Sequence, residues 1–206
     1  MSIVTYNNRS IRNISAIPGA TKSLTLIKTL TASGDSTLSF VDGSSDVVLD
    51  STYPIYIFKF IDLNPATDDK KFQFNLSTDS GSNYNVSKTT TFLRAYHNES
   101  GSSTQFAYDT GNDLANGTGV KVFTESAGNG SDESAVGELT LFNPSSTTFV
   151  KHFISRTSTY YTSDYAMDTF IAGYANTTSA IDAIQFSVES GGNFDGTIKL
   201  YGLKDS

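Results

Sequence analysis

Covalent chemistry needs a nucleophile beside a base, and this sequence offers little of either. Its 206 residues include no cysteine and only two histidines, His97 and His152. Each histidine lies in or beside a stretch that alternates between apolar and polar residues, where a packed or solvated ring is the usual outcome. None of the many serines stands in the Gly-x-Ser-x-Gly pattern that exposes a hydrolase nucleophile. We therefore expect no catalytic residues and no enzymatic activity.

Oxygen ligands at short spacing occur in two turn-like segments, residues 79–83 and 109–113. Both combine Asp, Asn and Gly, and a hard cation such as Ca²⁺ could use their oxygen atoms. Neither segment continues into a twelve-residue loop that ends in Glu, and Asx-rich turns contain the same residues without an ion. The glycines of residues 128–130 do not extend to the pattern of a phosphate-binding loop. We expect no metal and no cofactor, and leave calcium binding at the two turns open.

Aromatic residues are better candidates for binding. Tyr160, Tyr161 and Tyr165 lie among serines and threonines in residues 155–168, which we expect to form a loop at one end of the fold. Tyrosine offers a rigid, amphipathic contact surface at small entropy cost, which suits stacking on a host-surface glycan or contact with a protein. Core packing of some of these rings is the alternative interpretation. The absence of tryptophan counts mildly against a dedicated sugar platform.

The composition predicts a folded chain that binds neither nucleic acid nor the interior of a membrane. Aromatic residues make up 12% of the chain, charged residues 17%, and the net charge is −7. Binding to a phosphate backbone needs clustered Lys and Arg, which an acidic chain lacks. The N-terminal residues have no apolar signal-peptide region, and no stretch approaches 18 apolar residues. We expect synthesis in a cytoplasm and no membrane insertion.

The basic residues gather at the N-terminus. Residues 1–34 hold four bases and no acid, and Asp35 is the first acidic residue. Because residues 1–22 also contain apolar side chains, we interpret them as an extended arm that docks on an acidic neighbour. A solvated tail is the alternative. The candidate assembly residues of the arm are Ile3, Val4, Tyr6, Arg9, Ile11, Arg12 and Ile14.

Period-two alternation of apolar residues predicts strands throughout residues 23–206. The predicted strands are 24–30, 36–41, 53–61, 72–76, 90–97, 139–141, 149–154, 169–174, 184–188 and 197–201. About ten such strands predict a single antiparallel β-sandwich, jelly-roll-like, preceded by the arm. Residues 98–135 and 155–168 interrupt the pattern. Long connections are usually functional or mobile, and we expect both to project from the ends of the sandwich.

A series of short segments occurs in a characteristic order along the chain. They are Ile17-Pro18-Gly19, residues 24–30, Tyr53 with residues 56–58, residues 64–68, Phe72 with Phe74, residues 79–84 and residues 196–202. Together they resemble a group of poorly characterised virion proteins of tailed bacteriophages, many of them marine. The resemblance implies a non-enzymatic β-sandwich that decorates the capsid or is attached to the tail. It supplies no catalytic or binding residues.

These inferences predict a virion structural protein, most simply a capsid decoration protein made in the host cytoplasm. Residues 1–22 would tether it to other virion proteins, and we expect a homo-oligomer, with a trimer among the alternatives. The alternative function is a tail-associated adhesin or carbohydrate-binding module that contacts host glycans through residues 160–165. A sugar-processing enzyme would instead need two carboxylates facing each other across a cleft.

Overall fold

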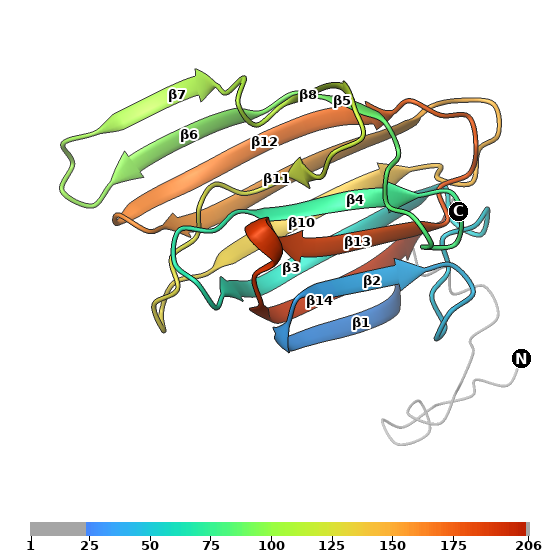
Figure 1. Cartoon of the computed structure of the whole chain (residues 1–206), viewed down its shortest axis with the longest axis horizontal. Coiled ribbons are helices and arrows are strands. Elements are labelled where there is room, and N and C mark those ends of the chain that lie inside the picture. Colours follow the sequence, from blue (N-terminus) through green and yellow to red (C-terminus); the bar gives the residue numbers. More distant parts are fainter. Residues whose placement is uncertain (1–23, 205–206) are drawn as a thin grey trace, which may run out of the picture.

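The computed structural model describes residues 24–204, and its regular secondary structure is almost entirely antiparallel strands (Figure 1). Fourteen strands form a ten-stranded sheet A and a four-stranded sheet B, and one short 3₁₀ turn lies at Glu189–Gly191. The prediction of an antiparallel β-sandwich is confirmed, with more strands than the expected ten. The candidate assembly residues between Ile3 and Ile14 lie outside the described residues.

Eight of the strands have the connectivity of a jelly roll. In sheet A the neighbouring strands are β1 (Leu24–Asp35), β14 (Phe194–Leu203), β3 (Ile55–Pro65) and β10 (Ala135–Phe142). In sheet B they are β2 (Thr37–Val41), β13 (Ala183–Val188), β4 (Phe72–Ser77) and β9 (Lys121–Val122). The chain crosses between the sheets from β1 to β2, β3 to β4, β9 to β10 and β13 to β14. This order is the pair of Greek keys that defines a jelly roll.

Two insertions widen sheet A beyond the edge of sheet B. Between β10 and β13 the chain forms a hairpin of β11 (Lys151–Tyr161) and β12 (Tyr165–Ala175). Between β4 and β9 it adds β5 (Lys88–Thr90), β6 (Leu93–Asn98), β7 (Thr104–Tyr108) and β8 (Leu114–Gly117). Both β5 and β6 pair with β12. Figure 1 shows β6 and β7 beyond the strands of sheet B, whereas the inward residues Met167, Thr169 and Ile171 of β12 are still buried.

The two segments that we expected to be long loops contain strands. Residues 155–168 run from β11 into β12, and residues 98–135 contain β7 and β8 besides β9, which confirms the short strand that the sequence predicts at residues 120–123. The inward-facing positions of β11 include the polar residues Ser155 and Thr157. Buried and exposed residues therefore alternate along this strand although apolar and polar residues do not. Their hydroxyls donate to Glu138 O and Phe123 O at 2.8 and 2.7 Å. These bonds make buried polar side chains acceptable in a sheet.

Phenylalanine rings fill the space between the two sheets. The buried ring of Phe186 lies 5.3 Å from Phe58, 5.4 Å from Phe60 and 6.2 Å from Phe40 between centroids. Most of these pairs are edge-to-face, the arrangement that aromatic quadrupoles favour. One core cluster therefore spans the jelly-roll strands and the extension, since it also contains Phe153 of β11 and Ile171 of β12.

Candidate functional site

Two of the three predicted tyrosines meet in a pocket on the inner face of the extension. Cross-strand register pairs Tyr161 with Tyr165, and Met167 with Tyr96 of β6. Because alternate residues of a strand share a face, these side chains point to the same side of the sheet. The pocket has a volume of about 310 Å³. We call it the tyrosine pocket, and its lining residues are Arg94, Tyr96, Tyr161, Ser163, Tyr165 and Met167.

The three rings of the tyrosine pocket pack against one another edge to face. The centroid of Tyr165 lies 5.4 Å from that of Tyr96 and 5.8 Å from that of Tyr161, at interplanar angles of 84° and 89°. Burial raises the pKa of Tyr161, and the nearby carboxylates of Asp69 and Glu125 add to that effect. The Tyr161 phenol therefore stays protonated at neutral pH and can both donate and accept hydrogen bonds.

Tyr160, the third predicted tyrosine, lies on the opposite face of the same hairpin. Its hydroxyl donates to Asp164 Oδ1 at 3.0 Å, with Glu99 Oε1 3.4 Å away. The bond to Asp164 raises the pKa of Tyr160 to about 12. The structure therefore separates Tyr160 from Tyr161 and Tyr165, because neighbours along a strand point to opposite faces.

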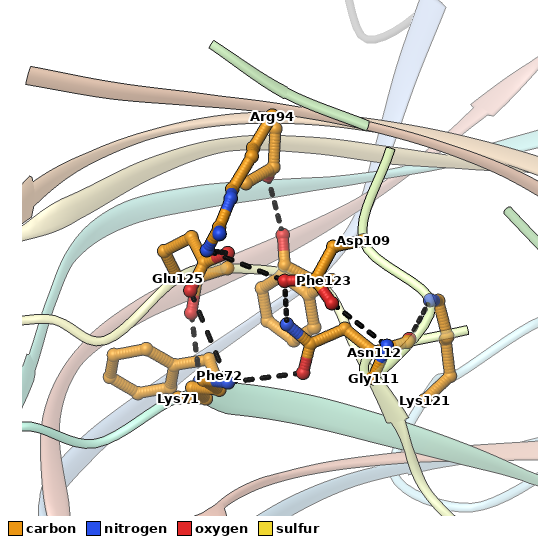
Figure 2. Close-up of polar contacts among 11 residues, drawn as sticks. Lys71, Phe72, Arg94, Asp109, Gly111, Asn112, Lys121, Phe123 and Glu125 are labelled. Atoms are coloured by element: carbon orange, nitrogen blue, oxygen red, sulfur yellow. Dashed lines mark hydrogen bonds and ion pairs between the residues drawn. The ribbon is translucent and has the colours of Figure 1, made fainter. Parts of the chain in front are cut away.

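A partly buried ion-pair network, shown in Figure 2, shares Arg94 with the tyrosine pocket. Arg94 Nη1 lies 2.8 Å from Glu125 Oε1 and 3.3 Å from Asp109 Oδ2. The Glu125 side chain is only 3% exposed, and Lys71 Nζ lies 4.0 Å from its other oxygen. Arg94 Nε is also buried but has no hydrogen-bond partner among residues 24–204. Arg94 thus links the network to the pocket and keeps one N–H unused.

Asn112 extends this network to two further segments. Its side chain accepts a hydrogen bond from Lys71 Nζ at 3.0 Å and donates one to Asp109 Oδ2 at 3.2 Å. Its backbone carbonyl accepts a bond from Lys121 Nζ at 2.6 Å. The network therefore ties the β7–β8 turn to β4, β6 and β9. Figure 2 shows these side chains converging from separate strands and turns.

Three lysines are fully buried, and sequence reasoning identified none of them. Lys88 Nζ donates to Asn75 Oδ1 and to Val86 O, and Lys151 Nζ donates to Thr177 O at 3.2 Å. Lys121 Nζ also lies 4.9 Å from the centroid of the Phe92 ring. Burial lowers the pKa of Lys88 and of Lys121 to about 8. Among residues 24–204, no ion pair involves these three lysines, so each is held by neutral acceptors.

The other residues considered from the sequence do not gather into a metal-binding cluster within the described fold. His97 and His152 are both exposed. Residues 24–204 contain no group of three or more His, Asp or Glu side chains that could hold a metal ion. In the two Asx-rich turns, Asp79 Oδ1 accepts bonds from Ser77 Oγ and Asn83 N, and Asp109 Oδ1 accepts one from Gly111 N.

The outer face of sheet A presents exposed apolar side chains. Two rows of residues, each in register from strand to strand, cross sheet A from β1 towards β12. Leu26 and Ile154 in the longer row are 50% and 54% exposed. We call these rows the apolar band. Its members are Leu24, Leu203, Ile55 and Phe142 in one row and Leu26, Tyr201, Ile57, Thr140, Ile154 and Ala172 in the other.

Charged side chains beside the apolar band are mostly paired within the face. Lys59 forms an ion pair with Glu138 on the neighbouring strand. Arg156 Nη2 lies 2.7 Å from Asp168 Oδ2, and its guanidinium lies 4.7 Å from the centroid of Phe170. The face therefore combines an apolar centre with a flank whose charges largely cancel.

The fold places this chain among jelly-roll β-sandwiches. Comparison with protein-family models, curated proteins and solved structures found no match. In the described part of the chain, no helix has the length and apolarity needed to cross a membrane. Jelly rolls serve as capsid proteins, lectins and enzymes. A function for this chain must therefore be argued from its surfaces, namely the apolar band and the tyrosine pocket.

Proposed function

We propose that the chain is a non-enzymatic virion structural protein, most simply a capsid decoration protein that assembles as a homo-oligomer. Residues 1–22 attach it to other virion proteins, as their basic and apolar residues predict. The observation that carries the proposal is the apolar band on the outer face of sheet A. A jelly roll is a common architecture for particle proteins, and this likeness of fold is supporting analogy.

The apolar band fits a second copy of the same chain. Its longer row crosses six strands, which is roughly 24 Å from the first strand to the last at a strand spacing of about 4.8 Å. A contiguous apolar patch of this extent usually marks an interface in a water-soluble domain. Lys59 and Arg156 are paired with carboxylates on the same face, which leaves Lys199, in register with Lys59, as the cation of their row that forms no ion pair within residues 24–204. A self-complementary contact of this kind is the commonest route to a homo-oligomer.

The oligomeric state of the full-length chain tests this proposal. Light scattering after size exclusion, with sedimentation velocity, should show an oligomer for the wild type. Replacing both Leu26 and Ile154 by Glu places four charges in each dimeric contact and should weaken association by at least about tenfold. The matched control is Val120→Glu, because Val120 is 42% exposed but lies outside the apolar band. This control should associate like the wild type.

Two results would contradict the proposal. One is a wild-type chain that remains monomeric at its highest soluble concentration. The other is an oligomer that the L26E/I154E pair leaves intact while both chains stay folded by circular dichroism. Dissociation by V120E alone would move the interface to the β8–β9 connection and would equally reject the apolar band.

A further inference from the structure

The tyrosine pocket has the geometry of a ligand site on the side of the molecule opposite to the apolar band. It lies on the inner face of sheet A, where β6 extends past sheet B (Figure 1). We propose that this pocket binds a neutral saccharide. The inference stands apart from the assembly proposal, because the two use opposite faces of the same sheet.

The lining residues provide both kinds of contact that sugar recognition needs. The rings of Tyr96, Tyr161 and Tyr165 supply apolar faces for the C–H groups of a pyranose, and their hydroxyls supply polar contacts at the ring edges. The edge-to-face contacts of Tyr165 with the other two rings hold this arrangement without a ligand. Such a prearranged aromatic surface lowers the entropy cost of binding.

Arg94 adds a hydrogen-bond donor at the border of the pocket. Its Nε–H is buried and has no partner within residues 24–204, although the guanidinium is fixed by Glu125 and Asp109. Nε itself is too buried for a ligand to reach, but Nη2 makes no hydrogen bond within residues 24–204 and can donate to a hydroxyl oxygen of a sugar. The ion pairs hold the guanidinium in place, so little side-chain freedom is lost when such a bond forms.

The charges around the pocket favour a neutral ligand over an anionic one. The positive charges of Arg94 and Lys71 are matched by Glu125 and Asp109, as the ion-pair distances show. Asp68 accepts hydrogen bonds from Thr162 Oγ1 at the tip of the β11–β12 hairpin. An acidic sugar would therefore meet no unpaired cation and would be repelled by the carboxylate near the hairpin.

The size of the pocket limits the ligand to a small portion of a glycan. Its volume of about 310 Å³ is at the lower end of the range for small-molecule sites, roughly 300–1,000 Å³. Ser163 and Tyr161 come from the end of the hairpin, where a longer glycan chain could leave the pocket. We therefore assign one or two terminal sugar units to the site.

Binding of the full-length chain to oligosaccharides tests the inference. The probes are two immobilised panels, one of neutral hexose and N-acetylhexosamine oligosaccharides and one of their sialylated counterparts. Tyrosine fluorescence then measures the affinity for each hit in solution, because the chain contains no tryptophan. We expect binding to neutral members and at least tenfold weaker binding to sialylated ones. Tyr165→Ala should weaken binding at least tenfold, since Tyr165 contacts both other rings.

Tyr160→Phe is the matched control, because Tyr160 lies in the same hairpin but on the opposite face. It should bind like the wild type. If Tyr165→Ala does not fold, the pair Tyr96→Phe and Tyr161→Phe removes two hydroxyls while it keeps the rings, and this pair should also weaken binding.

The inference is wrong if the wild type binds no neutral saccharide, prefers the sialylated panel, or binds equally well after the pocket substitutions. Loss of oligomers in the assembly experiment would leave these binding results unchanged, so the two proposals can fail separately.

Discussion

At the scale of single residues, Lys88 makes a defined contribution to the pH dependence of stability. Burial lowers its pKa to about 8 in the folded chain, from the ordinary lysine value of 10.5. Between these values the unfolded chain binds more protons, so the free energy of unfolding that Lys88 contributes rises with pH. Below about pH 8 the buried ammonium costs on the order of 3 kcal/mol relative to the neutral amine. Lys88 is therefore a pH-dependent weak point of the β5 region.

The corresponding prediction compares the wild type with Lys88→Met by urea unfolding at about pH 7 and about pH 10. The stability of the wild type relative to the variant should increase by about 2 kcal/mol between the two pH values. Replacing the exposed Lys204 by Met is the control. The difference in the free energy of unfolding between this variant and the wild type should be the same at both pH values. If the difference in the free energy of unfolding between the wild type and Lys88→Met does not change with pH, the folded state keeps this amine protonated.

At the scale of elements, the Arg94–Glu125 pair fastens the β6–β7 hairpin to the segment that follows β9. Glu125→Gln should lower the free energy of unfolding by about 2 kcal/mol, because it leaves Arg94 partly buried without its closest carboxylate. Hydrogen exchange should accelerate first in β6 and β7. Arg156→Gln removes the ion pair with Asp168, in which the Arg156 side chain is 65% exposed, and should cost less than about 1 kcal/mol. Equal losses in the two variants would contradict the anchoring role of Glu125.

The strands also show which parts of the fold could be predicted from the sequence alone. Strands with apolar inward residues, such as those around residues 56–60 and 184–188, were predicted from their alternation and are confirmed. Parts of β11 and β12 were predicted as strands 149–154 and 169–174, but their continuation through residues 155–168 was missed because Ser155 and Thr157 occupy buried positions as hydrogen-bonded hydroxyls. No local pattern could reveal those bonds, since their acceptors come from other strands and turns.

The residues of the tyrosine pocket, too, could be predicted only in part from the sequence. Residue type alone singled out Tyr161 and Tyr165, which are four residues apart and meet across a hairpin. Tyr96 and Arg94 come from β6, and only the register between β6 and β12 places them beside these tyrosines. Glu125 belongs to a third segment, so its pairing with Arg94 depends on how the insertion between β4 and β9 folds. Single side chains can thus be predicted from the sequence, whereas their assembly depends on non-local pairing.

At the scale of the whole molecule, the distribution of charge separates the N-terminal segment from the sandwich. The chain carries a net charge of −7, although residues 1–23 contain three bases and no acid. The strand pairs and the core of the sandwich lie within residues 24–204. Deletion of residues 2–16 should therefore leave the fold intact while it removes attachment to the particle. Circular dichroism checks the first outcome.

Immunogold electron microscopy of purified virions, with antibodies raised against residues 98–135, checks whether the deletion removes attachment to the particle. This segment includes Phe106 and Tyr108 of β7, which are 69% and 48% exposed, so antibodies can reach it unless a partner covers it. Gold over the shell would support a capsid decoration protein, and gold on the tail would favour the adhesin alternative. The truncated chain should give no label in either place. Normal loading of the truncated chain would rule out attachment through residues 2–16, because the sandwich alone would then suffice for assembly.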